Sequence, residues 1–153
     1  AIATAKTLAQ TLKIDLVGVS SLLALVPEEI EGLAIPVMDA RRNHVYAGFY
    51  QEDQLVYPEA HLSFEAVLER AKGAEKVTFL GEVKAFREQI QEALPNAQMV
   101  ETLPDAVRIG RLGLTKEAVS AHGFVPNYLK RVEAEENWLK DHQESGQSYI
   151  KRL

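Results

Sequence analysis

Cysteine is absent from this chain of 153 residues, which excludes disulfide bonds, thiolate metal ligands and cysteine nucleophiles. The absence is consistent with a reducing compartment, and we expect a cytoplasmic protein. Positive charge is also scarce, because 17 lysines and arginines stand against 22 aspartates and glutamates. Proteins that bind nucleic acid nonspecifically usually carry a basic surface. The chain as a whole is therefore not expected to do so, although a local basic patch stays open.

Long hydrophobic runs are missing as well. The longest, Leu22 to Pro27, is far shorter than the roughly 20 residues that cross a bilayer, and two glutamates follow it. We therefore expect no membrane contact. The first residues, Ala1-Ile2-Ala3-Thr4, contain neither a methionine nor a signal-peptide pattern, and they resemble the middle of a helix. From this we expect an N-terminally truncated chain.

Apolar residues are plentiful, and their spacing predicts an α/β protein. They make up 46% of the chain, enough for a core in one domain or two small lobes. Helical spacing predicts a helix over residues 1 to 12, followed by a short buried strand over 16 to 19. A second helix is predicted from Ser20 or Ser21 to about Val26.

The remainder predicts three strands in succession and then alternating helices and strands. The predicted elements are strands over 35–39, 45–50, 54–57, 77–80 and 97–100, and helices from Ser63 to Gly73, from Glu82 to Pro95 and from Pro104 to about Ala121. The order β-β-β-α-β-α-β-α is typical of a ribonuclease-H-like lobe of the actin-like (ASKHA) class.

The domain organisation follows from this order. The α-β-α elements of the first segment match the end of a similar lobe, so residues 1–31 are interpreted as the C-terminal remnant of a first lobe. Residues 32–129 then form a complete second lobe, and residues 130–153 a charged C-terminal helix and tail.

Several short segments resemble the TsaB (YeaZ) family along nearly the whole chain. The most specific are Asp39-Ala40-Arg41-Arg42 before Val45-Tyr46-Ala47, and Pro126-Asn127-Tyr128-Leu129-Lys130. Further resembling segments are Ala3-Thr4-Ala5-Lys6, Leu16-Val17-Gly18-Val19-Ser20-Ser21-Leu22, Ala134-Glu135 and Trp138.

The resemblance implies a function in tRNA modification. TsaB-like proteins pair with the catalytic subunit TsaD and the ATPase TsaE, and the complex makes N6-threonylcarbamoyladenosine at position 37 of tRNA. The resemblance thus implies a non-catalytic scaffold or activator subunit that has no cofactor and meets tRNA only through the complex. The alternatives are an M22-type glycoprotease-like hydrolase and an actin-fold ATP-binding enzyme fragment. A third hypothesis is a homodimer that forms through residues 1 to 12.

The residues themselves offer little catalytic chemistry. Phosphate-binding hairpins let the backbone approach through glycine, but Asp39 to Asn43 contains none. The four histidines lack metal-ligand spacing, so we expect no metal. Ser20-Ser21 lacks the glycine of a nucleophile elbow, and a helix cap is the better interpretation.

Arg41 and Arg42 are the best candidate site residues. Their guanidiniums can contact a phosphate, a carboxylate of the partner, or tRNA. The alternative, which has the greater weight, is a solvated tip with one arginine paired to Asp39. A base-stacking platform of Tyr46, Phe49 and Tyr50 is also conceivable. Strand alternation instead favours Phe49 facing opposite to the two tyrosines, in the core.

Overall fold

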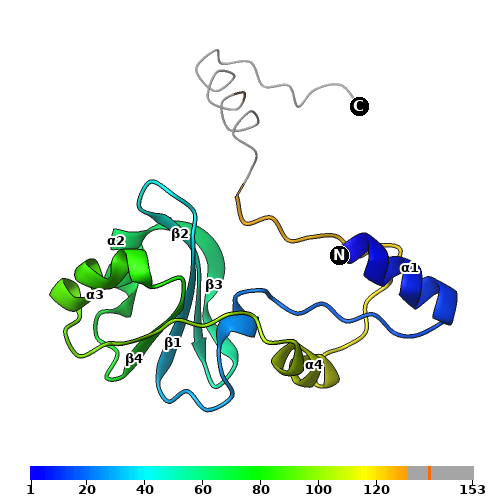
Figure 1. The fold of residues 1–153 in the computed structure, drawn as a ribbon, viewed down its shortest axis with the longest axis horizontal. Helices are drawn as coiled ribbons and strands as arrows, with labels where there is room; N and C mark the ends of the chain where they lie inside the picture. The colour runs from blue at the N-terminus through cyan, green and yellow to red at the C-terminus, as the bar shows by residue number, and fades with distance from the viewer. Residues whose placement is uncertain (131–137, 139–153) are drawn as a thin grey trace, which may run out of the picture.

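The computed structural model describes residues 1–130 and Trp138. Its centre is a five-stranded mixed sheet in the order β3-β2-β1-β4-β5 (Figure 1). The first three strands form an antiparallel meander, β4 lies parallel to β1, and β5 lies parallel to β4. The strands are β1 (Leu33–Asp39), β2 (His44–Gln51), β3 (Gln54–Ser63), β4 (Val77–Gly81) and β5 (Gln98–Val100).

Helices cover both faces of this sheet. They are α1 (Ile2–Leu12), α2 (Phe64–Ala71), α3 (Arg87–Ala93) and α4 (Ala106–Leu114), with 3-10 turns η1 (Leu23–Leu25) and η2 (Lys84–Phe86). Figure 1 shows α2 and α3 on one face and α4, with α1 beyond it, on the other. The predicted order β-β-β-α-β-α-β-α is confirmed from β1 to α4, so the fold is an α/β lobe of the ribonuclease-H-like, actin-like class.

The main core lies between the sheet and the helices α2 and α3. Successive strand residues point to opposite faces, so alternate positions of β1, β2 and β4 enter this core. The aromatic rings of Phe64 and Phe86 stack there with centroids 4.2 Å apart, and Phe79 packs beside Phe64. The fully buried members include Ile35, Val37, Val45, Ala47, Phe49, Phe64, Val67, Phe79, Val83 and Ile90.

A smaller core occupies the opposite face, under η1 and α4. It is formed by Leu23, Val26, Ala34, Tyr50, Leu80 and Leu112. The two cores together bury both faces of β1 and β4, which explains why these central strands read as nearly continuous apolar runs.

Strand β3 is longer than the sequence predicts. It continues through Pro58 to Ser63 instead of ending at Tyr57. Because β3 is an edge strand with a neighbour on one side only, the missing N–H of a proline is tolerated there.

The predicted strand over 16–19 and the helix that follows it are wrong. Within the described residues, the first segment makes only a single antiparallel bridge, between Leu16 and Val119. A strand needs a partner for successive main-chain groups, and this segment has one at one position. The second segment forms only the 3-10 turn η1. Its cap is nevertheless as expected, since the Ser20 hydroxyl accepts the N–H groups of Leu22 and Leu23.

The predicted Ser63 cap of α2 is confirmed, and α4 begins after a cap at Asp105. The Ser63 hydroxyl accepts the N–H of Ala66, and Asp105 accepts the N–H groups of Val107 and Arg108. Such caps satisfy donors that the first helical turn leaves without partners.

The predicted length of α4 is wrong, because the helix ends at Leu114 and not near residue 121. Gly110 and Gly113 each lower helix propensity by about 1 kcal/mol relative to alanine. The Thr115 hydroxyl then donates to the Leu112 carbonyl and closes the last turn.

The helix predicted to open at Glu82 begins later, with η2 and then α3. Glu82 is engaged elsewhere, because its carboxylate accepts the N–H of Asp39 at 2.6 Å. The terminal helix predicted over 130–140 and the tail after it lie outside the described residues, apart from Lys130 and Trp138. None of the described helices has the length and apolar character needed to cross a bilayer.

Candidate functional site

The hairpin between β1 and β2 has an unusual backbone at its tip. Arg41, Arg42 and Asn43 have φ angles of 66°, 51° and 59°, so three successive residues without glycine are left-handed. This conformation costs an L-residue roughly 1–2 kcal/mol, and asparagine tolerates it best. The surrounding contacts must therefore hold the tip in place.

Hydrogen bonds inside the hairpin supply part of this support. Asp39 accepts the main-chain N–H of Arg41 at 2.8 Å. The N–H of Ala40 donates to the His44 carbonyl at 2.9 Å, and the N–H of His44 donates to the Arg41 carbonyl at 3.0 Å. These three N–H groups already have acceptors, so they cannot surround a bound phosphate in this conformation.

Asn43 links the tip to the neighbouring helices. Its side-chain amide donates to Glu65 at 2.6 Å and accepts from Gln89 at 2.9 Å. Its main-chain carbonyl accepts the N–H of Phe64, at the start of α2. The tip is thus fixed to α2 and α3 on the main-core side of the sheet.

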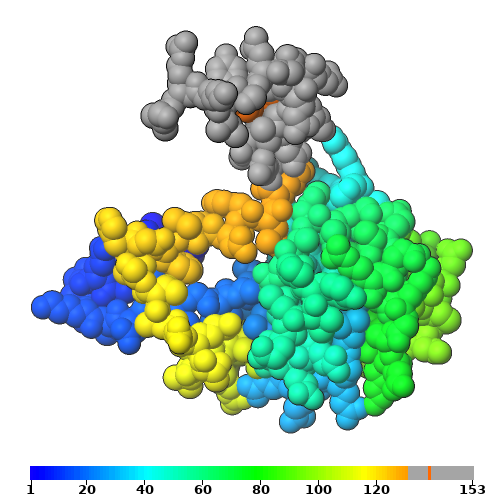
Figure 2. All heavy atoms as spheres, turned by 180° about the vertical axis from the view of Figure 1, so that it is seen from behind, coloured from blue at the N-terminus to red at the C-terminus, as the bar shows by residue number. Residues whose placement is uncertain are grey.

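The guanidiniums of Arg41 and Arg42 are exposed, and within residues 1–130 neither forms an ion pair with a carboxylate. The predicted pairing of one arginine with Asp39 is absent there, because that carboxylate receives a main-chain N–H instead. Glu82 and Glu65 are likewise engaged, by the Asp39 N–H and the Asn43 amide. Figure 2 shows this tip, in cyan, standing out from the body of the molecule.

Two histidines that are far apart in the sequence stack beside the tip. The rings of His44 and His61 have centroids 5.1 Å apart and planes 14° apart. Tyr46 lies next to His61, at 5.3 Å between centroids. We call these three side chains the ring ladder. His44 Nδ1 lies 2.8 Å from the Arg42 carbonyl, so it carries the proton and donates.

The sequence did not indicate this ladder. Residues directly opposite in an antiparallel pair share a face, and Tyr46 lies opposite His61. The sequence shows that His44 and Tyr46 alternate on one strand and so share a face. It does not show that His61 lies opposite Tyr46, because that depends on the pairing register of β2 and β3.

The platform of three aromatic residues is excluded, and the opposite orientation of Phe49 is confirmed. Phe49 is fully buried in the main core, whereas Tyr50 belongs to the smaller core. The Tyr50 hydroxyl donates to Glu59, and so does the Ser20 hydroxyl. Burial, and then the hydrogen bond to Glu59, raise the pKa of Tyr50 well above its usual range. Ser20 is thereby held as a structural cap.

A groove of about 840 Å³ adjoins the ring ladder on the same face of the sheet. Tyr46 and Met38 contribute to its floor, and segments 18–22 and 116–130 form its walls. Lys6 of α1 donates to the carbonyls of His122 and Phe124 and so ties α1 to the wall formed by segment 116–130. Both polar and apolar side chains line the groove.

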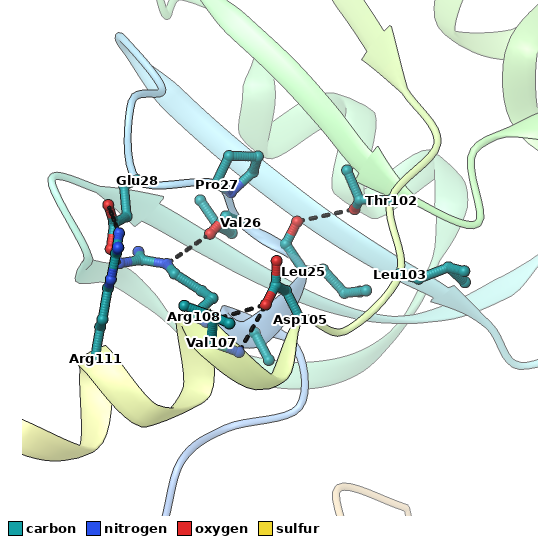
Figure 3. A pocket seen from close by; sticks show the side chains of 11 residues that line it. Leu25, Val26, Pro27, Glu28, Thr102, Leu103, Asp105, Val107, Arg108 and Arg111 are labelled. Carbon is teal, nitrogen blue, oxygen red and sulfur yellow. Dashed lines mark hydrogen bonds and ion pairs between the residues drawn. The ribbon is translucent and has the colours of Figure 1, made fainter.

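A second hollow, of about 400 Å³, lies where α4 meets the loop after η1 (Figure 3). The Arg108 Nε donates to the Val26 carbonyl at 2.9 Å, and its guanidinium also pairs with Asp53 in the β2–β3 turn. Arg111 pairs with Glu28 at 2.8 Å across the mouth (Figure 3). These contacts hold α4 in place, so we assign this hollow a structural role.

Within the described part of the chain, no group of three or more histidine, aspartate or glutamate side chains is placed to hold a metal ion. His142 lies outside the described residues.

The fold and the tip together define the class of protein: an actin-like α/β lobe whose first hairpin has no glycine at its tip and has three of its N–H groups engaged. A family model described as "TsaD: tRNA N6-adenosine threonylcarbamoyltransferase" matches residues 1–138. The chain therefore belongs to this TsaD-like family.

Two relatives narrow the position within the family. The chain is 36% identical over 148 residues to the "tRNA threonylcarbamoyladenosine biosynthesis protein TsaB" of Bacillus subtilis (strain 168), with 89% of this chain and 65% of the relative covered. The solved structure of YeaZ from Pseudomonas aeruginosa is 25% identical with a TM-score of 0.59, and 84% of this chain and 65% of that one are covered. The resemblance to the TsaB (YeaZ) family is thus confirmed. The chain spans 65% of the length of each relative.

Proposed function

We propose that this chain is part of a non-catalytic scaffold or activator subunit in the synthesis of N6-threonylcarbamoyladenosine at position 37 of tRNA. Its partners in this proposal are a TsaD-like catalytic subunit and a TsaE-like ATPase, and it acts in the cytoplasm. The observation that carries the proposal is the 36% identity to a TsaB over 148 residues.

Two features of the hairpin support a non-catalytic function. The residues at its tip carry side chains although their backbone is left-handed, and three of its N–H groups donate within the hairpin. Phosphate-binding loops of actin-like enzymes need such N–H groups to point at the ligand. The hairpin as built therefore favours a scaffold over an ATP-binding enzyme.

The proposal includes the division of the chain into a first-lobe segment (1–31), a second lobe (32–129) and a C-terminal segment (130–153). It also places Arg41 and Arg42 at a contact surface for a partner or a phosphate. Self-association into a homodimer is the competing proposal, since Leu8 and Leu12 lie exposed on one side of α1, at 51% and 61%.

The test uses the full-length gene product in cells depleted of their own TsaB. Expression is expected to restore threonylcarbamoyladenosine, quantified by mass spectrometry of digested tRNA, and the tagged protein is expected to capture the TsaD-like subunit. If the full-length protein neither restores the nucleoside nor captures that subunit, the proposal is wrong. Size-exclusion chromatography of the protein alone tests the homodimer.

A further inference from the structure

We propose that the hairpin tip and the ring ladder form a contact surface for single-stranded RNA. Arg41 and Arg42 bind the phosphates, and one unpaired base stacks at an exposed end of the ladder. This inference deepens the proposed function and rests on it, because it assigns to named residues an RNA contact that the tRNA-modifying complex makes.

Arg41 and Arg42 bring two guanidiniums to the tip. Each carboxylate that contacts the tip is already engaged: Asp39 by an N–H of the tip, Glu82 by the Asp39 N–H and Glu65 by the Asn43 amide. Within residues 1–130 neither guanidinium forms an ion pair or a side-chain hydrogen bond, so both keep their donors for a ligand. Arginine is suited to phosphate because its planar fork can donate two parallel hydrogen bonds. Hydrogen bonds from neutral N–H groups do not cancel the charge of these three carboxylates, so the guanidiniums offer a phosphate directed donors and not a net positive patch.

The backbone of the tip is strained and firmly anchored. The left-handed backbone of residues 41–43 is costly without glycine, yet four hydrogen bonds fix it from Asp39, Glu65, Gln89 and His44. A backbone that costs energy and is held by several contacts indicates a function for the geometry that it imposes. Here that geometry presents two arginines on adjacent positions of a protruding, fixed turn (Figure 2).

The ring ladder offers a stacking surface beside the tip. The ladder places His61 between His44 and Tyr46, and all three residues are partly exposed. The His44 and His61 rings are nearly parallel, whereas the Tyr46 ring is tilted by 52° against His61. A flat aromatic base can extend the His44–His61 stack, and stacking on side-chain rings is the usual way that proteins hold unpaired RNA bases.

A hydrogen bond joins the ring ladder to the hairpin tip. His44 Nδ1 donates to the carbonyl of Arg42, so the ladder begins at the residue that carries the second guanidinium. A phosphate and its own base can then be held together. An acidic protein surface would use the arginines but not the rings, which is why the combination favours RNA.

Binding is measured by fluorescence anisotropy with the full-length protein, alone and together with the TsaD-like subunit. The probe is a fluorescein-labelled RNA stem–loop with an unpaired loop, and a continuous RNA duplex is the comparison. The stem–loop is expected to bind more tightly than the duplex. If neither RNA binds under either condition, or if both bind equally, the inference is wrong.

The variants separate charge from stacking. In Arg41→Ala/Arg42→Ala, affinity for the stem–loop is expected to fall by about tenfold or more, and the slope of log K against log salt to decrease by about 1.4, or roughly 0.7 for each lost phosphate contact. The matched control is Lys72→Ala/Lys76→Ala, which removes the same charge at the other end of the sheet, where Val77 pairs with Leu33. Equal loss in both double variants would mean nonspecific attraction and would overturn the inference.

His44→Leu is expected to weaken the stem–loop complex by about tenfold with no change in salt slope, as the loss of a stacked base predicts. His44→Phe keeps a ring and is expected to retain binding, which distinguishes stacking from a folding defect. Unchanged affinity in His44→Leu would contradict the stacking step.

The same variants are tested for capture of the TsaD-like subunit, so that the two proposals fail separately. Capture that persists while RNA binding is lost supports the RNA surface. Loss of capture in Arg41→Ala/Arg42→Ala with RNA binding intact would show that the tip contacts a protein, and it would overturn this inference while leaving the proposed function standing.

Discussion

Tyr50 shows at the residue scale how one side chain links distant segments. Its ring lies in the smaller core, 3% exposed, and its hydroxyl donates to Glu59, which also accepts from Ser20. The phenol is held in its neutral form first by burial, which disfavours the charged phenolate, and then by its hydrogen bond to the Glu59 carboxylate. The raised pKa of Tyr50 therefore has a consequence for stability at high pH.

Stability is expected to fall above about pH 10 by up to roughly 1.4 kcal/mol per pH unit through this group. The sign follows from the unfolded chain, in which the phenol ionises near pH 10 while the folded protein keeps its proton. Tyr50→Phe lacks the hydroxyl that donates to Glu59, so its free energy of unfolding at neutral pH is expected to be about 1 kcal/mol lower. The variant has no phenol to ionise, so its difference from the wild type shrinks at high pH. Urea unfolding between pH 7 and 11 measures it, and a difference that grows with pH would contradict the assignment.

Gly81 is the second case at this scale, since it has a φ of 89° at the end of β4. A Cβ there would lie 2.5 Å from the Val37 carbonyl oxygen and 2.9 Å from a methyl of Leu25. Gly81→Ala is therefore expected to lower the free energy of unfolding by about 2 kcal/mol or more.

Gly73→Ala is the matched control for Gly81→Ala. Gly73 has a φ of 92°, but a Cβ added there would meet no atom within 4 Å, so only backbone strain applies, at about 1 kcal/mol. Urea denaturation of both variants measures the difference. Equal losses would mean that the close approach to β1 does not matter.

At the scale of elements, one arginine joins α4 to two loops, while Leu112 of the same helix packs in the smaller core. The Arg108 side chain is 10% exposed and joins α4 to the Val26 carbonyl (Figure 3). It also pairs with Asp53 in the β2–β3 turn. Arg111, one turn further on, is 63% exposed, and its pair with Glu28 lies at the surface.

Arg108→Met is expected to destabilise the protein by about 2–3 kcal/mol, because the Val26 carbonyl and Asp53 lose a partner. Arg111→Met is expected to cost less than about 1 kcal/mol, as exposed ion pairs do. Thermal unfolding compares the two variants, and hydrogen exchange of α4 shows where the loss occurs. Similar effects in both would show that the buried arginine does not hold α4.

At the scale of the whole molecule, the two sides of the sheet differ in how firmly they are packed. The main core joins α2 and α3 to the central strands, whereas α1 has only Ala9 buried. The described contacts of α1 and its following segment include Lys6 with two carbonyls and the Leu16–Val119 bridge.

We therefore expect the amides of β1, β2 and β4 to exchange slowest and those of α1 to exchange much faster, since local opening needs less energy where little is buried. Lys6→Met removes the tie to His122 and Phe124 and is expected to accelerate exchange in α1 without changing β4. Hydrogen exchange followed by mass spectrometry measures both. Protection of α1 equal to that of β4 would contradict this picture.

The sheet could be predicted from the sequence because its signals are local. Alternating apolar residues mark β1, β2 and β4, and the Ser63 and Asp105 caps mark the starts of α2 and α4. The segments that failed, 16–19 and 20–26, depend on partners elsewhere, and only the bridge to Val119 was there to complete a strand.

The site could be predicted only in part, because the sequence does not reveal which residues of β2 and β3 lie opposite each other. A two-residue turn at Glu52–Asp53 with constant register would place Tyr46 opposite Glu59. Two register shifts, between Ala47 and Tyr50, place it opposite His61 instead. Such β-bulges insert residues that no periodicity reveals. The ring ladder was therefore invisible in the sequence.

The sequence by itself determined the order of strands and helices from β1 to α4, the family resemblance and the two arginines of the tip, because periodicity, caps and short motifs are properties of neighbouring residues. Only the tertiary structure decided that Asp39, Glu65 and Glu82 are engaged by the tip and its anchors, that His44 and His61 stack beside it and that Tyr46 lies against His61. Those contacts join residues from β1, β2, β3, α2 and the loop after β4, and their geometry follows from strand register and packing.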